Sequence, residues 1–388
     1  MLVGAGSVSN TAGLQASAVC TVSQAAASRV AFGGYSIRRE NDVLRTRFAE
    51  QYGLEMPFVC AGMGFVGMPP LVGAVSDAGG MGTLGASPLP PEAVRSMIRQ
   101  IRSMTSQPFG VNFITPFTED AHIEVCIEEK VPVVSFHWEA PPEAFISRLQ
   151  DGGAKVWMQV GSVRQAHEVV RLGVDAVIVQ GSEAGGHVRG AASTLVLVPA
   201  VIDAIAPLPV VAAGGIADGR GVAAALALGA DAVWVGTRMV ATQEANVHDE
   251  YKRRIVTATE TDTIVTTLFG PEWPDAPARV LRNRIVNEWA GREKEIVHTT
   301  NQSQSIGRTL LGGEEYIMPK FSAFPPTPET TGDFEEMMMV AGESSGLVKE
   351  IRPAGEIVHE MMEEARRIIV ERLSPLADGF RDAGVDDV

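Results

Sequence analysis

The chain has 388 residues, with 32 basic against 47 acidic side chains and a formal net charge of −15. A chain this acidic lacks the basic face needed to bind nucleic-acid phosphates or an anionic membrane surface, so we expect neither partner. With 45% hydrophobic and 20% charged residues, the chain can bury a large core. No apolar run reaches the ~18 residues of a membrane-spanning helix. The three cysteines, Cys20, Cys60 and Cys126, have neither a disulfide pattern nor zinc-ligand spacing.

The first 39 residues contain no Asp or Glu and three arginines, Arg29, Arg38 and Arg39. This composition is compatible with a transit peptide, but a disordered tail or a misassigned start codon explains it more simply. We interpret residues 1–41 as a leader outside the fold. We expect a cytoplasmic protein and leave organellar targeting open.

Short apolar runs alternate with helical stretches from about residue 54 onward. Continuous rather than alternating apolar runs indicate strands that are buried on both faces, as in a parallel sheet. An open doubly wound sheet would more often have fewer strands and a glycine fingerprint after the first one. The sequence therefore predicts an α/β fold, a (β/α)8 TIM barrel over residues 42–240. The expected strands are 56–61, 81–85, 109–113, 131–136, 155–160, 175–180, 208–213 and 231–236.

The alternation stops near residue 240. Residues 241–345 hold helical stretches, proline-rich turns and the run Met337–Met339, which we assign to packing. We expect a mainly helical cap inserted after the eighth strand, forming a substrate subdomain. Apolar residues spaced i, i+3, i+4 over 354–373 predict a helix that packs on the barrel wall. It belongs to a C-terminal segment, 346–388, whose acidic end is expected to fray.

Glycines follow the last two predicted strands, at the end of a barrel where active sites lie. Gly214 and Gly215 follow the seventh strand, and Gly236 and Thr237 follow the eighth, each just before an expected helix. Backbone N–H groups at such turns can hold a phosphate, helped by the helix N-termini and the threonine hydroxyl. Tight turns without a ligand are the alternative for one pair, but two such loops favour phosphate. Because the net charge repels an anion, local dipoles must hold it.

The loop after the sixth strand carries the main catalytic candidate, His187. An unperturbed imidazole titrates near about pH 6.5, so it can accept or donate a proton at neutral pH. A histidine that merely hydrogen-bonds the loop backbone is the alternative. Glu183, four residues earlier, is more consistent with pinning the loop than with orienting the imidazole. His137, after the fourth strand, is a second candidate.

Asn112 and Gln159 lie at the ends of two further strands. Each amide can both donate and accept hydrogen bonds, which suits a planar heterocycle with mixed edges. Amides that brace a loop are the alternative. No His, Cys, Asp or Glu cluster has metal-ligand spacing, so we expect no metal. Cys60 is interpreted as a small buried hydrophobe.

Several of these segments together resemble the nitronate monooxygenase family, formerly called 2-nitropropane dioxygenases. The likeness covers about residues 42–375, and its most specific part combines GSEAGGH with AAGGIADG. The segments are LRTRF (44–48), VSDAGGMGTLGA (75–86), VNFITPF (111–117), VSFHW (134–138), GSEAGGH (181–187), AAGGIADG (212–219), VGTRM (235–239) and FGPEWPDAPARVLRN (269–283).

The resemblance implies an FMN-dependent barrel. His187 matches the catalytic histidine that acts on the nitro substrate over the flavin, and His137 is assigned with it to substrate binding. One departure exists, because Gly62 stands where the family commonly has a proline before the methionine, which would make this loop more flexible. The positions implied for cofactor binding are Gly62, Met63, Gly64, Asn112, Gln159, Gly181, Gly186, Ala213, Gly214, Gly215, Gly236 and Thr237.

Three functions follow as hypotheses. The first is oxidation of propionate-3-nitronate or alkyl nitronates by FMN and O₂, with His187 as a base or as a hydrogen-bond donor. The second is an FMN-dependent enoyl-acyl-carrier-protein reductase that uses NAD(P)H, for which the net charge of −15 is mildly unfavourable. The third is a redox-silent binder of a phosphate ligand, which the histidine in the loop argues against. The expected partners are a small nitronate and O₂, and assembly into a homodimer is left open.

Overall fold

The computed structural model describes residues 44–270, 273, 275–296 and 304–376. The expected leader, 1–41, and the acidic end, 377–388, lie outside the described residues. Among the described residues, no helix has the length and apolar character needed to cross a membrane.

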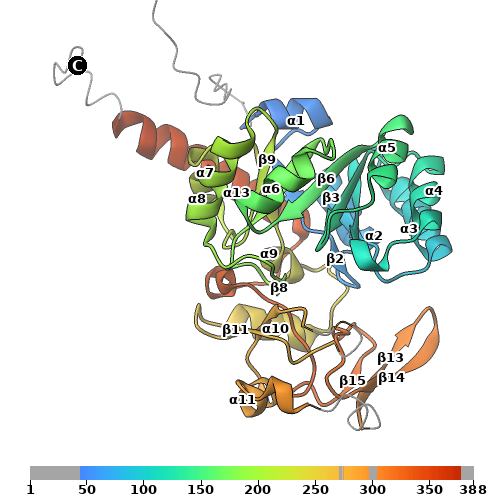
Figure 1. Cartoon of the computed structure of the whole chain (residues 1–388). Helices are drawn as coiled ribbons and strands as arrows, with labels where there is room; N and C mark the ends of the chain where they lie inside the picture. Colours follow the sequence, from blue (N-terminus) through green and yellow to red (C-terminus); the bar gives the residue numbers. More distant parts are fainter. Residues whose placement is uncertain (1–43, 271–272, 274, 297–303, 377–388) are drawn as a thin grey trace, which may run out of the picture. The chain divides into compact units, whose positions relative to one another are not determined.

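A parallel sheet rolls into a barrel, which lies in the upper part of Figure 1. Each of the predicted runs overlaps one of its strands, to within two residues at either end, and is buried almost throughout. The α/β barrel is therefore confirmed. Its strands are β1 (Phe58–Cys60), β3 (Gly82–Gly85), β4 (Phe109–Ile114), β5 (Val133–His137), β6 (Lys155–Val160), β7 (Ala176–Gln180), β9 (Val210–Ala213) and β10 (Ala232–Val235).

The barrel closes through its first strand, which is split into two pieces. β1 pairs with β10, while the short continuation β2 (Met63–Gly64) pairs with β3. Two backbone hydrogen bonds join β1 to the residue before β3. Cys60 N donates to Met81 O, and Met81 N donates to Phe58 O, each at 2.8 Å. All the strands of the barrel are parallel, so their carboxyl ends meet around one mouth of the barrel.

Amphipathic helices cover the outside of the barrel, and the helix predicted at 354–373 is confirmed as one of them. This helix, α13 (Ala354–Arg367), buries Ile357, Val358 and Met361 and packs on α8 and α2, completing the ring. It continues as a π-helical stretch, Ile368–Leu373. The other outer helices are α2 (Pro69–Asp77), α3 (Pro91–Met104), α4 (Asp120–Glu128), α5 (Glu143–Asp151), α6 (Val163–Val170), α7 (Thr194–Ile205) and α8 (Gly219–Ala227).

The short helix α1 (Arg47–Tyr52) packs against the barrel interior. Phe48 and Tyr52 belong to one buried cluster with strand residues such as Trp157 and Trp234. Trp157 Nε1 donates a hydrogen bond of 2.9 Å to the Tyr52 hydroxyl. Large side chains therefore fill this part of the barrel, which leaves ligand space at the mouth formed by the strands' carboxyl ends.

The region after the eighth barrel strand contains strands as well as helices, so the expectation of a mainly helical cap is wrong. The hairpin of β13 (Ser305–Leu311) and β14 (Glu314–Pro319) turns at Gly312 and Gly313, whose φ angles are +60° and +90°. A Gly-Gly pair between two alternating runs is a hairpin signal, and here it outweighs the helical pattern. The Met337–Met339 run is buried, as expected. Besides short 3₁₀ turns, the described elements of this cap are α9 (Thr237–Val240), α10 (Asp249–Thr257), β11 (Thr263–Thr266), β12 (Ala278–Leu281), α11 (Arg284–Trp289), β13 (Ser305–Leu311), β14 (Glu314–Pro319) and β15 (Thr331–Gly332).

Candidate active site

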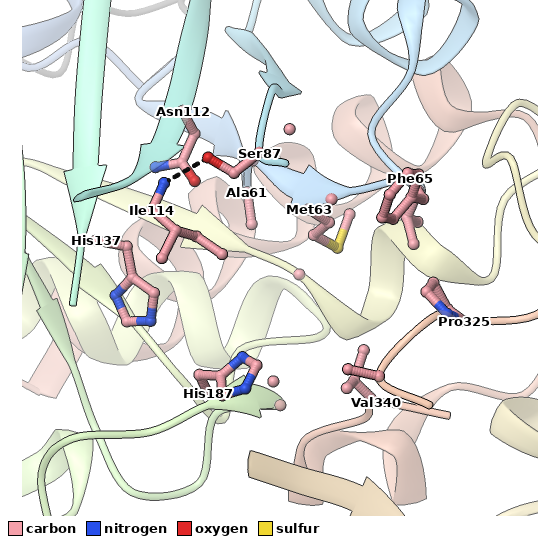
Figure 2. A pocket seen from close by; sticks show the side chains of 18 of the residues that line it. Ala61, Met63, Phe65, Ser87, Asn112, Ile114, His137, His187, Pro325 and Val340 are labelled. Carbon is pink, nitrogen blue, oxygen red and sulfur yellow. Dashed lines mark hydrogen bonds between the residues drawn. The ribbon is translucent and has the colours of Figure 1, made fainter. Parts of the chain in front are cut away.

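A cavity of about 630 Å³ opens at the carboxyl ends of the barrel strands, between the barrel and the cap. This volume is in the usual range for cofactor and substrate sites. Figure 2 shows His137 and His187 on one side of the view, and Phe65 and Pro325 on the other. All the predicted site residues except Gly181 line the cavity, namely Gly62, Met63, Gly64, Asn112, His137, Gln159, Gly186, His187, Ala213, Gly214, Gly215, Gly236 and Thr237.

Gly181 is required for packing instead. A Cβ atom at this position would lie 2.1 Å from Thr194 Oγ1 and 2.4 Å from Glu183 Oε2. The sequence shows a glycine after a strand in either case, so it does not distinguish a ligand contact from a tight approach by a neighbouring helix.

The loops after β9 and β10 form a backbone cradle at one wall of the cavity. Gly214 and Gly215 have φ angles of +103° and +73°, a conformation that side-chain-bearing residues rarely adopt. The Thr237 hydroxyl accepts a hydrogen bond of 2.8 Å from Gly342 N, which leaves its proton free for a ligand. Backbone N–H groups and one oriented hydroxyl are the donors that a phosphate needs.

The helix N-termini contribute less to this cradle than the sequence suggested. α8 begins at Gly219, and its first N–H groups are already held by Asp218 and by Glu364, whose Oε2 accepts from Gly219 N at 2.7 Å. α9 has only four residues, so its dipole is small. α8 therefore starts after Asp218, beyond Gly214 and Gly215, whereas α9 starts directly after Gly236.

His187 belongs to β8 (Gly186–His187), a short strand that pairs with β12 of the cap. Gln180 Nε2 donates a hydrogen bond of 3.0 Å to His187 O, and the Trp273 ring lies 4.3 Å from the imidazole, between ring centroids. Burial lowers the pKa of His187 to about 4. The cavity therefore contains an uncharged imidazole at neutral pH.

His137 is the second imidazole of the cavity, and its Nδ1 is buried with no hydrogen-bond partner among the described residues. Burial, followed by the charges of His187 and Arg189, lowers its pKa to about 3. The next residue, Trp138, has φ +84°, a strained value for a bulky side chain. Its ring lies 5.9 Å from both imidazoles, so His137, Trp138 and His187 form one aromatic wall.

The two strand-end amides differ in their surroundings. Asn112 Nδ2 donates a hydrogen bond of 2.9 Å to Ser135 Oγ, so this amide braces the neighbouring strand and also lines the cavity. Its oxygen is left as an acceptor. Gln159 makes no side-chain hydrogen bond within the described part of the chain. A Cβ on Gly62 would lie 2.2 Å from Asn112 Cβ. The position where the family commonly has a proline therefore tolerates no side chain in this structure.

Glu183 pins the loop, as expected. Its carboxylate accepts hydrogen bonds of 3.0 Å from both the N–H and the hydroxyl of Thr194, at the start of α7. On the other side, Arg279 of β12 donates to Ser182 O through Nε and Nη2. The loop from 181 to 187 is thus held by the barrel and by the cap.

The roof of the cavity was missed by the sequence reasoning. It is a mostly apolar set from the cap, far along the chain from the strand ends, and only the Gly312–Gly313 pair, an unused hairpin signal, could have pointed to part of it. Gln180 was missed too, although it ends a strand just as Gln159 does. The roof residues are Leu311, Tyr316, Pro319, Ser322, Ala323, Phe324, Pro325, Met338, Val340 and Ser344.

Metal and thiol chemistry find no support in the described residues. No group of three His, Cys, Asp or Glu side chains there could hold a metal ion. Cys60 is buried, as expected, and desolvation raises its pKa to about 12, so it remains a thiol.

An α/β barrel with glycine-rich loops, two amides and an uncharged histidine at one mouth is the arrangement of a barrel enzyme, whose active site lies at that mouth. A family model described as nitronate monooxygenase matches residues 45–122 and 116–364. The chain belongs to this family, and it is an oxidoreductase. Members of the family are generally flavin enzymes.

Individual relatives carry different activities in their names. One relative, from Mycobacterium tuberculosis, is named a 5-hydroxy-7a-methyl-1-oxo-octahydro-1H-indene-4-carboxyl-CoA dehydrogenase. It is 35% identical to this chain, over 83% of this chain and 96% of its own. A protein of Staphylococcus aureus named "Probable nitronate monooxygenase" is 30% identical over 84% of this chain and 98% of its own.

Solved structures that resemble this chain also carry different activities in their titles. FabK from Thermotoga maritima has a TM-score of 0.70 at 38% identity, over 86% of this chain and 99% of its own. A nitroalkane oxidase from Streptomyces ansochromogenes has a TM-score of 0.69 at 28% identity, over 83% of this chain and 99% of its own.

Proposed function

We propose that this protein oxidises nitronates, such as propionate-3-nitronate or alkyl nitronates, with FMN as cofactor and O₂ as co-substrate. The observation that carries the proposal is the pairing, in one cavity, of a backbone cradle suited to phosphate with an uncharged imidazole. Both the family and the structural neighbours support flavin chemistry at such a site.

The residues present fit FMN. Gly214, Gly215, Gly236 and Thr237 would hold its phosphate by backbone N–H groups and one hydroxyl. A Cβ on Gly236 would meet only ordinary contacts of 3.7 Å or more, which indicates space left beside Ala61 and Met63. FMN, when bound, supplies the electron-accepting chemistry.

The two strand-end amides would take the polar edge of the ring system. Asn112 offers an acceptor and Gln159 offers both an acceptor and donors. Together with Met63 and Ala213 they fill the strand-end side of the cavity, opposite the roof.

His187 would act on the substrate as a neutral imidazole. A neutral imidazole can accept a proton from a nitroalkane carbon, or donate one ring N–H to the oxygens of a nitronate. An anionic nitronate needs only the second role, which suits a histidine that burial keeps uncharged.

The direct test combines absorbance and oxygen uptake. Purified protein should carry, or bind on addition, a flavin with its visible absorbance. It should then consume O₂ with propionate-3-nitronate without NADH. A protein that binds FMN but ignores every nitronate would contradict this proposal.

A thioester oxidoreductase is the second candidate, because relatives named as a carboxyl-CoA dehydrogenase and as FabK are 35% and 38% identical to this chain. Reducing an enoyl thioester adds a hydride and a proton. A histidine with its pKa near 4 is a weak source of that proton at pH 7. NADH consumption with a crotonyl thioester, in place of nitronate oxidation, would establish this alternative.

A further inference from the structure

A cluster of cap residues holds the loop that carries His187, and these residues have no part in the proposed function. Arg279 on β12 is the centre of this cluster, and its side chain is only 12% exposed. Its Nε and Nη2 donate to Ser182 O at 3.1 and 2.9 Å, and its Nη1 donates to Thr263 Oγ1 at 3.2 Å. A buried guanidinium that places two donors on one loop carbonyl fixes the position of that loop.

Glu343 completes the cluster because it contacts both Arg279 and the loop. Its Oε1 lies 3.0 Å from Arg279 Nη2, which balances the buried charge. Its backbone N–H donates a hydrogen bond of 3.0 Å to Glu183 O, one residue along the same loop. The side chain and the backbone of Glu343 therefore act on neighbouring points of the loop.

Close backbone packing removes the remaining freedom of the loop. A Cβ on Gly185 would lie 2.6 Å from Ala341 C, and a Cβ on Gly342 would lie 2.6 Å from Glu183 O. In β-sheet register, Arg279 also stands opposite Gly186, the neighbour of His187. The cap thus grips the loop from Ser182 to Gly186 immediately before the imidazole.

We propose that Arg279, supported by Glu343, is a positioning residue that sets the place of His187 in the cavity and makes the cap a structural part of the catalytic loop. Among the described residues, its hydrogen bonds and ion pair go to Ser182, Thr263 and Glu343, and none goes to the imidazole or the cradle. Its effect passes through the backbone of the loop. The activity readout of this proposal rests on the proposed function, and its structural readouts do not.

The test compares Arg279→Lys with Arg282→Lys, an exposed arginine on the same segment that serves as a matched control. Lysine keeps the charge but cannot place two donors on one carbonyl. We expect kcat for propionate-3-nitronate to fall ~10-fold or more in Arg279→Lys, because small misplacements of catalytic groups are costly. KM and the FMN dissociation constant should stay within about twofold, because the cradle is not touched. Arg282→Lys should match the wild type.

Two readouts are independent of turnover. Amide hydrogen exchange of residues 182–187 should become faster in Arg279→Lys, while exchange in α3 stays unchanged. The NMR titration of His187 should move toward the ordinary histidine pKa of about 6.5, because a loosened loop admits water. Glu343→Gln should show the same changes to a smaller degree, and it decides the question if Arg279→Lys does not fold.

Each outcome is decisive. Wild-type exchange and wild-type His187 titration in Arg279→Lys and Glu343→Gln would overturn the positioning role, whatever the enzyme oxidises. Equal losses in Arg279→Lys and Arg282→Lys would overturn it as well. If no nitronate is turned over by the wild type, the proposed function fails, and faster exchange with a shifted His187 titration still supports the role of Arg279.

Discussion

The hydroxyl of Thr237, at the end of the eighth barrel strand, accepts a hydrogen bond from the backbone N–H of Gly342, 105 residues further along the chain. This single bond joins the cradle of the barrel to the cap. Because the hydroxyl oxygen is the acceptor, its proton stays available for another hydrogen bond.

Thr237→Val should weaken FMN binding about tenfold or more, because it removes one donor to a charged phosphate and leaves Gly342 N unpaired. Thr237→Ser keeps the hydroxyl and should bind FMN nearly as the wild type does. Fluorescence titration with free FMN measures both dissociation constants. Equal affinities for Thr237→Val and the wild type would show that the hydroxyl does not face the phosphate.

His187→Asn should lower turnover of a neutral nitroalkane by ~10²-fold or more if the imidazole accepts the proton. With a preformed nitronate the loss should be smaller, since no proton has to be removed. His167→Asn, an exposed histidine on α6, is the control and should leave both rates unchanged. Steady-state oxygen uptake with the two substrates separates the roles. Unchanged turnover in His187→Asn would remove the residue from catalysis.

Stability should fall as the pH drops from about 6.5 toward 4. The pKa of His187 is lowered to about 4 in the folded protein, so between these values the unfolded chain binds a proton that the folded chain does not. Protonation then favours unfolding, and this one histidine should contribute about 2 kcal/mol to the loss between pH 7 and pH 5. Urea midpoints at the two pH values measure the loss. In His187→Asn the difference between the midpoints should shrink, and an undiminished difference would argue against the shifted pKa.

Gly62→Ala should destabilise the protein by about 1–3 kcal/mol, because the added Cβ meets Asn112 within 2.2 Å and overpacks the strand ends. It should also weaken FMN binding, since Asn112 has to move. Gly355→Ala in α13 is the matched control, where the new Cβ would meet Ala78 Cβ at 3.5 Å. There helix propensity predicts a gain of about 0.5–1 kcal/mol. Thermal unfolding of the two variants, with and without FMN, provides the comparison.

The barrel could be predicted from sequence because its strands are buried on both faces. Runs such as 155–160 and 208–213 have few other structural interpretations, and His187 was found because two glycines and a strand precede it. The environment of each residue was harder to predict. Glu364 reaches the N-terminus of α8 from 145 residues away, and no local pattern shows this.

The same limit explains the missed part of the site. Tyr316 and Phe324 reach the cavity only because the cap folds back over the strand ends, and no spacing in the sequence links them to His187. Gly181 was assigned to the ligand because a glycine needed for packing has the same appearance in a sequence as one needed for binding. Thr194, which fills that space, lies in the next helix.

The cavity takes its two sides from different stretches of chain. The cradle and the amides come from residues 61–237, while the roof comes from residues 311–344. Within the described part of the chain, the roof residues before Gly342 do not bond the cradle, whereas Gly342 N bonds the Thr237 hydroxyl. We therefore expect an exchange of residues 304–338 with a relative that has another substrate to change substrate choice and to leave the cradle in place. Relatives with different substrates can diverge in this part of the cap while they keep the same barrel.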